Sequence, residues 1–121
     1  MAQRVEDIEV GTIESMLDAM RVDLGLSRVD IVAALHMTDT ELASWRATGA
    51  RPDEATLQRL QTLVGLRDGL QELFAETEGV HEWMHAELRD LRWRTPQQAF
   101  RDGDLDEVYA AFVGLASGIF I

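Results

Sequence analysis

The chain has 121 residues, with 22 acidic side chains against 11 basic ones, and its formal net charge is −11. Cysteine is absent, which excludes disulfide and thiolate chemistry. At this length we expect one compact domain, or two small ones that share a core. A charge this negative argues against indiscriminate binding to nucleic acid or anionic membrane, because binding to phosphates depends on clusters of basic side chains.

The sequence does not predict export or membrane insertion. No apolar run approaches the ~20 residues that span a bilayer, and the first ten residues lack the basic start and apolar core of a secretion signal. We therefore expect a cytoplasmic protein.

The negative charge is unevenly spread along the chain. Residues 1–25 carry 2 arginines and 6 acids, residues 52–80 carry 2 and 6, and residues 81–121 carry 4 and 7. Residues 26–51 carry 3 of each and are neutral. If any face of the protein approaches DNA, we expect residues 26–51 to form it.

Apolar residues recur three and four positions apart nearly throughout the chain, which predicts an all-α fold. The predicted helices cover residues 12–24, 28–35, 39–47, 52–73, 80–91, 96–101 and 105–117. The expected N-caps are Thr12, Ser27, Thr38 and Thr95, and the expected helix stops are Gly25 and Gly118. Residues 76–79 form the predicted boundary between an N-terminal domain, residues 1–78, and a C-terminal domain, residues 79–121.

Residues 25–52 have the layout of a helix-turn-helix, in which two short capped helices flank a tight turn. His36 falls at the turn, where a positive φ is often needed, and Leu42 is the inward anchor of the second helix. The segment resembles an Xre-type helix-turn-helix in three stretches, Ser27-Arg28, Leu35-His36-Met37-Thr38 and Leu42-Ala43-Ser44-Trp45-Arg46.

DNA contacts would come from outward side chains at the start of the second helix and from nearby arginines. The residues predicted to face DNA are Arg28, Thr38, Asp39, Thr40, Ser44 and Arg46. Asp39 and Glu41 bring negative charge to this end, so we expect DNA binding that is weak or depends on a partner. Three packed helices without a DNA contact are the alternative.

Residues 83–121 carry the most specific pattern in the chain. Its motifs are Trp83-Met84, Leu91, Arg94-Thr95-Pro96, Phe100-Arg101-Asp102-Gly103, Val108 and Gly118-Ile119-Phe120. In this ungapped order they resemble the toxin-binding domain of Xre/MbcA/ParS-type antitoxins, a family that also carries an Xre-like helix-turn-helix. Glu87-Leu88 stands where the family often has Pro-Asn, and Arg92-Trp93 where it often has Gly-Gly. These departures favour a longer helix over the family's usual tight turn.

The resemblance implies an all-α antitoxin of a type II toxin–antitoxin system that is not an enzyme and needs no cofactor. Members of the family neutralise RES-domain toxins, which degrade NAD, by placing their C-terminal segment near the entrance of the toxin's active site. The toxin contacts implied here are Trp83, Arg94, Gly118, Ile119, Phe120 and Ile121. Further implied partners are operator DNA, bound as a complex to repress the antitoxin's own operon, and a second copy or a hetero-oligomer. The long leucine-faced helix offers a surface for dimerisation.

The apolar tail agrees with such a contact. Burying an Ile and a Phe side chain in a partner would contribute ~1.5 to 3 kcal/mol each. Gly118 gives the chain freedom to turn into a cleft. The alternative is a tail, Ile119-Phe120-Ile121, that packs on the protein's own core.

His81-Glu82-Trp83-Met84-His85 is a literal HExxH, which can place two imidazoles and a general base on one helical face for zinc. A catalytic zinc needs a third protein ligand, but the one further histidine, His36, belongs to the predicted helix-turn-helix. We therefore expect no metal site and interpret His81 and His85 as surface histidines. Two other functions stay open, a DNA-binding regulator without a toxin and a small zinc hydrolase.

Overall fold

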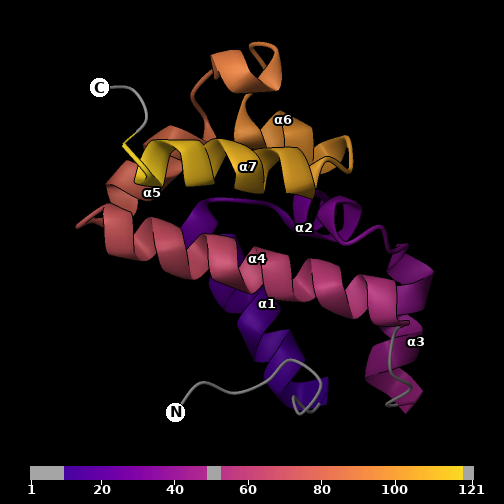
Figure 1. Cartoon of the computed structure of the whole chain (residues 1–121). Helices are drawn as coiled ribbons and strands as arrows, with labels where there is room; N and C mark the ends of the chain where they lie inside the picture. The colour runs from indigo at the N-terminus through magenta and orange to yellow at the C-terminus, as the bar shows by residue number, and fades with distance from the viewer. Residues whose placement is uncertain (1–9, 49–52, 119–121) are drawn as a thin grey trace.

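The structure, a computed structural model, describes residues 10–48 and 53–118. Its helices are α1 (Val10–Leu24), α2 (Arg28–Ala34), α3 (Asp39–Thr48), α4 (Glu54–Leu73), α5 (Thr77–Met84), the 3-10 helix η2 (Arg89–Leu91), α6 (Pro96–Arg101) and α7 (Leu105–Ala116) (Figure 1). These residues contain no strand, which confirms the predicted all-α fold. None of the described helices is long and apolar enough to cross a bilayer.

Three of the predicted N-caps form capping boxes. In a capping box, the N-cap side chain accepts a hydrogen bond from the backbone N–H three residues later, and the side chain of that later residue accepts one from the N-cap N–H. Ser27 and Asp30 form one at the start of α2, Thr38 and Glu41 one at α3, and Thr95 and Gln98 one at α6. Helix α4 begins at Glu54 with Asp53 as its N-cap, because the Asp53 carboxylate accepts from the N–H of Thr56 at 2.8 Å. The prediction placed this start slightly too early, at Pro52, which lies outside the described residues.

One apolar core joins the helices of the two predicted domains. Buried side chains from α1 to α7 form a single cluster, in which α2 packs on α6, α1 on α5 and α4 on α7. The leucine face of α4 supplies its centre with Leu60, Leu63, Leu66 and Leu70, which are fully buried. This face is therefore not available as a dimer surface, and that expectation is wrong.

Helix α7 lies close against α4 because two glycines leave room for aromatic rings. A Cβ at Gly69 would overlap the Phe112 ring, whereas one at Gly65 would lie 3.8 Å from the Tyr109 ring. The two glycines are four residues apart, so they occupy the same face of α4. The two rings of α7 are themselves in contact, with centroids 6.2 Å apart.

The predicted helix over residues 80–91 is wrong, because α5 ends at Met84 and a turn follows η2. Arg92 and Trp93 take left-handed φ values of 58° and 67°, a conformation that costs an L-residue roughly 1–2 kcal/mol. Buried Leu91 and the hydrogen bonds of Arg94 offset this cost, since the Arg94 Nε donates to the Leu91 carbonyl at 3.1 Å. Tertiary contacts therefore keep the tight turn although its sequence contains no glycine.

Candidate functional site

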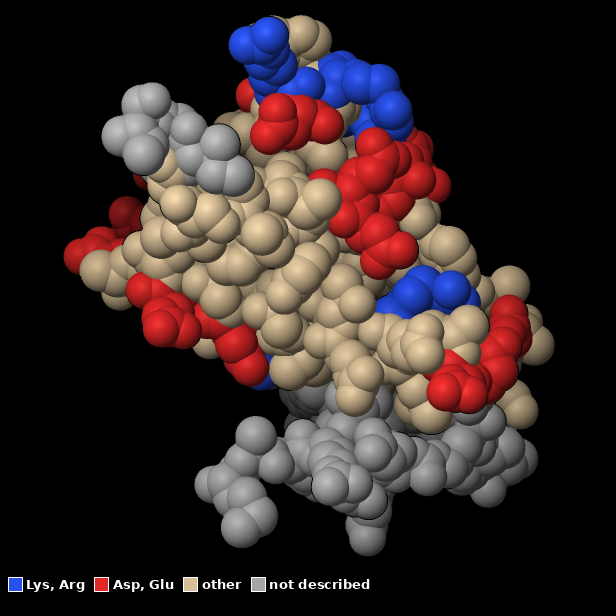
Figure 2. Space-filling view, in the orientation of Figure 1, with Lys and Arg blue, Asp and Glu red and all other residues tan. Residues whose placement is uncertain are grey.

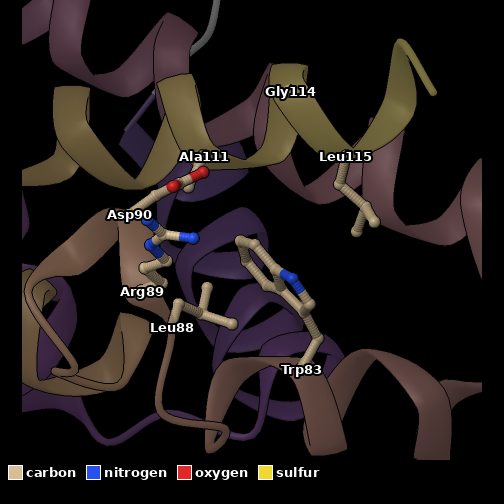
Figure 3. Close-up of a pocket in the computed structure, with 7 residues that line it drawn as sticks. All are labelled: Trp83, Leu88, Arg89, Asp90, Ala111, Gly114 and Leu115. Atoms are coloured by element: carbon tan, nitrogen blue, oxygen red, sulfur yellow. The ribbon is translucent and has the colours of Figure 1, made fainter. Parts of the chain in front are cut away.

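A groove of about 540 Å³ separates α5 and η2 from the second half of α7. It is lined by Trp83, Leu88, Arg89, Asp90, Ala111, Gly114 and Leu115. The side chains of Trp83 and Leu115 point toward the same space from α5 and α7, while Arg89 and Asp90 lie at one end (Figure 3). Trp83, one of the predicted toxin contacts, is only 9% exposed and forms the floor of the groove. The groove therefore offers a largely apolar surface with one charged end.

The outer face of α7 carries no charge beyond its first turn. Asp106 and Glu107 begin the helix, and no charged residue follows as far as Gly118. Tyr109 and Val113 are partly exposed on this face. Figure 2 shows a wide uncharged area in the centre of the view, over α7 and α4, with acidic side chains at its border. In a chain of net charge −11, such a face is suited to contact with another protein.

Gly118 follows the C-cap of α7 with a φ of 67°, which confirms it as the stop of this helix. It lies three residues beyond Leu115, so the chain leaves α7 beside the groove. The other predicted tail contacts, Ile119, Phe120 and Ile121, lie outside the described residues.

Arg94 is held by the protein's own carboxylates. Its guanidinium donates to Asp102 and Asp104 at 2.8 Å each, and a second nitrogen lies 3.6 Å from Glu107. The hydrogen bonds that Arg94 donates to Asp104 and Asp102 raise the pKa of Arg94, and the bond from Arg94 lowers the pKa of Asp104. The structure thus places this predicted contact residue in a network that fixes the turn after η2 against the start of α7.

The predicted DNA-facing residues gather around the start of α3. His36 has the expected positive φ, 56°, and Thr38, Asp39, Thr40 and Ser44 are exposed. Arg28 of α2 pairs with Asp39 at 3.4 Å across the turn. The side chain of Arg46 lies outside the described part of the chain. In Figure 1, α3 lies at the opposite end of the molecule from α5 and the end of α7.

Two side chains that the sequence did not single out for this role join α2 to the C-terminal part. Asp30 is fully buried, accepts from the Ser27 N–H and the Gln97 amide at 3.1 Å each, and pairs with Arg101. Burial raises the pKa of Asp30, but these hydrogen bonds outweigh it and bring the pKa below its usual value. The His36 Nε2 donates to the Gly103 carbonyl at 2.7 Å. An aspartate three residues after an N-cap signals a capping box, and no local pattern reveals that it also bonds α6.

The HExxH histidines bond the end of α1. His81 Nε2 donates to the Val22 carbonyl at 2.7 Å, and His85 Nε2 donates to the Gly25 carbonyl at 3.2 Å. The Val22 carbonyl belongs to the last turn of α1, where no intrahelical donor is available, and Gly25 is the first residue after that helix. Among the described residues no group of three metal-ligating side chains occurs. Zinc binding through the two Nε2 atoms would require both hydrogen bonds to break.

No family model matches the chain. Over 112 residues, 93% of this chain and 98% of the relative, it is 27% identical to the mycobacterial cidal antitoxin MbcA of Mycobacterium bovis and of Mycobacterium tuberculosis. It is also 27% identical over 109 residues to the probable mycobacterial cidal antitoxin Rv3188 of M. tuberculosis, covering 88% of this chain and 89% of that one.

The fold leads to the same group of proteins. The structure matches a chain of the crystal structure of the M. tuberculosis MbcT–MbcA toxin–antitoxin complex with a TM-score of 0.57 and 27% identity, covering 90% of this chain and 97% of that chain. The fold and these relationships define an antitoxin of a toxin–antitoxin system. Within that class, the chain is similar to the MbcA-type antitoxins.

Proposed function

We propose that the chain neutralises a RES-domain, NAD-degrading toxin by binding it through the C-terminal region, and that it acts by binding and not as an enzyme. The observation that carries this proposal is the uncharged face of α7, which leads to Gly118 beside the groove. The three residues after Gly118 in the sequence, Ile119, Phe120 and Ile121, are all apolar as well. Since NAD is consumed in the cytoplasm, we expect the pair to act there.

Each predicted contact has a distinct part in this proposal. Ile119, Phe120 and Ile121 enter the toxin near its active site, and Trp83 supplies the floor of a groove that receives a toxin side chain. Arg94 positions the turn at the charged end of the groove through its carboxylate partners. The acidic residues around the uncharged face complement basic side chains that bind the phosphates of NAD.

The test uses the purified RES-domain toxin encoded beside the antitoxin gene, with NAD consumption as the readout. Deleting residues 118–121 should abolish neutralisation while thermal unfolding stays unchanged, because the buried core lies within residues 17–112. Val29→Ala is the matched control, since Val29 is exposed on α2, away from the groove. Suppression of NAD loss by the shortened chain at unchanged affinity would overturn the role of the tail.

We also propose that the complex represses its own operon through the residues around the start of α3. The capped turn with a positive φ at His36 supports this, whereas the Arg28–Asp39 pair and Glu41 argue for weak binding by the isolated antitoxin. In gel-shift assays with DNA from upstream of its own gene, the toxin should strengthen retardation. Arg28→Ala should weaken it, and Arg89→Ala, at the other end of the molecule, serves as control without toxin. If no retardation occurs with or without the toxin, autorepression is rejected.

A further inference from the structure

The turn after η2 exposes a tryptophan from a backbone conformation that tryptophan disfavours. Arg92 and Trp93 are consecutive left-handed residues, in a region of φ that suits glycine. The Trp93 side chain is 64% exposed and does not belong to the apolar core. Trp93 therefore contributes little buried apolar surface to the fold, and glycine at this position would remove the strain of the left-handed backbone conformation.

The turn is nevertheless held in one shape. The N–H of Trp93 donates to the Leu88 carbonyl at 2.9 Å, and the N–H of Leu88 donates to the Arg94 carbonyl at 3.1 Å. Fully buried Leu91 fixes the turn from below. Strained residues that the surrounding structure holds in place concentrate at functional sites. A tryptophan on a rigid turn also loses little conformational freedom on binding, and Trp and Arg are frequent among the residues that dominate protein interfaces.

The charges around Trp93 fit a protein partner better than a nucleic acid. Arg89 and Arg92 are exposed on the same turn, but Asp90 lies between them and Glu107 pairs with Arg92 at 3.3 Å. Figure 2 shows basic and acidic side chains together at the top of the view, where the turn lies in Figure 1. Phosphate binding needs an excess of positive charge, which this mixture does not supply.

The turn continues the groove that the proposed function assigns to the toxin. Leu88, Arg89 and Asp90 line that groove, and Trp93 follows them within the same hydrogen-bonded turn. The backbone of Trp93 is therefore bonded directly to Leu88, one of the residues that line the groove. This continuity favours the toxin over a second copy of the chain as the occupant.

We propose that Trp93 is a second anchor for the toxin, inserting into an apolar pocket whose edge carries carboxylates for Arg89 and Arg92. The inference rests on the proposed function. It adds a contact that is separate from the tail, and it makes Trp93 a determinant of which toxin the chain recognises.

The experiment measures the affinity of the full chain for the purified toxin by calorimetry, using Trp93→Ala and Trp93→Gly. Both variants lose the indole, but alanine keeps the strained backbone and glycine relieves it. Both should bind the toxin at least about tenfold more weakly. Thermal unfolding should occur at an equal or higher temperature for Trp93→Gly than for the unmodified chain. Val29→Ala, another exposed apolar residue, should bind with unchanged affinity.

The possible results separate the two proposals. If the unmodified chain does not bind the toxin, the proposed function fails and this inference fails with it. If the unmodified chain binds and Trp93→Ala binds equally well, only the inference is overturned. Light scattering gives the remaining outcome: a change in oligomeric state at unchanged toxin affinity would identify Trp93 as a self-association contact and would also overturn the proposal.

Discussion

Asp30 shows how one side chain can serve both a helix and the tertiary fold. Its carboxylate completes the capping box of α2 with Ser27 and also bonds Gln97 and Arg101 of α6. Arg101 is half exposed, so water partly satisfies the cation, but the carboxylate is fully buried. The stability of the α2–α6 contact therefore depends on Asp30 being charged.

We predict that Asp30→Asn lowers the free energy of unfolding by ~1–3 kcal/mol at pH 7, because hydrogen bonds to a charged buried group are lost. The folded-state pKa of Asp30 is lowered, so its contribution is fully present above the ordinary carboxyl pKa of about 3.9 and is lost as the pH falls through the folded value. The difference between the two proteins, measured by urea unfolding, should thus shrink from pH 7 to pH 3.

The control is Glu72→Gln, at an exposed site on α4, which should change stability by less than ~0.5 kcal/mol. An equal difference between the unmodified chain and Asp30→Asn at both pH values would contradict the charge-dependent role of Asp30.

Residue roles were predictable from the sequence where the partner is local. The positive φ of His36 follows from its place in the helix-turn-helix pattern and is confirmed. The roles of His81 and His85 were not predictable, since the carbonyls they bond lie 59 and 60 residues earlier. The same limit applies to Arg92 and Trp93, because Arg94 fixes their turn through partners on a later segment.

At the scale of helices, the contact of α4 with α7 depends on which side chains face each other. Gly65 and Gly69 lie one turn apart on α4, opposite Tyr109 and Phe112 of α7. In sequence, both glycines weaken the helix equally, by about 1 kcal/mol relative to alanine. In the structure, the space available to a methyl group differs between them.

We predict opposite effects for alanine at these two positions. Gly69→Ala should lower the free energy of unfolding by ~1–3 kcal/mol, because the new Cβ overlaps the Phe112 ring and the ring must shift. Gly65→Ala should raise it by ~0.5–1 kcal/mol, since Tyr109 leaves room for a methyl group and alanine favours the helix. Chemical denaturation monitored by circular dichroism measures both. Equal changes in the free energy of unfolding for the two variants would show that helix propensity alone determines their stability.

The starts of α2, α3 and α6 were predicted to the residue, whereas the expected N-cap at Thr12 is wrong because α1 begins at Val10. The caps at Ser27, Thr38 and Thr95 each bond a residue three positions later, so the signal is contained in a short stretch of sequence. The residues that follow α5 make contacts outside their own turn: His85 bonds Gly25, Leu91 is buried in the core, and Arg94 bonds Asp102 and Asp104. A short stretch of sequence does not reveal these contacts, so the end of α5 was not predicted. The groove could not be predicted for the same reason, as it exists only where α5, η2 and α7 meet.

For the molecule as a whole, the two predicted domains share one set of buried side chains. Helices α2 and α4 belong to residues 1–78. They pack on α6 and α7, which belong to residues 79–121. Without those partners, buried leucines of α4 such as Leu66 and Leu70 would meet water.

We predict that a fragment of residues 1–78 does not fold cooperatively, whereas the full chain unfolds in one transition. The fragment loses the apolar surface that α6 and α7 cover, and a chain this short buries little surface of its own. Far-UV circular dichroism during heating measures both proteins. A fragment with a sharp transition near that of the full chain would show that residues 1–78 are an independent unit.

The shared core has a consequence for how such an antitoxin is removed from the cell. Because one core joins the two ends of the molecule, we expect a protease that opens the fold to disorder both ends, and under the proposed function toxin binding and operon repression would end together. Under the proposed function, turnover of this chain would release the toxin and restart synthesis of its replacement in the same step.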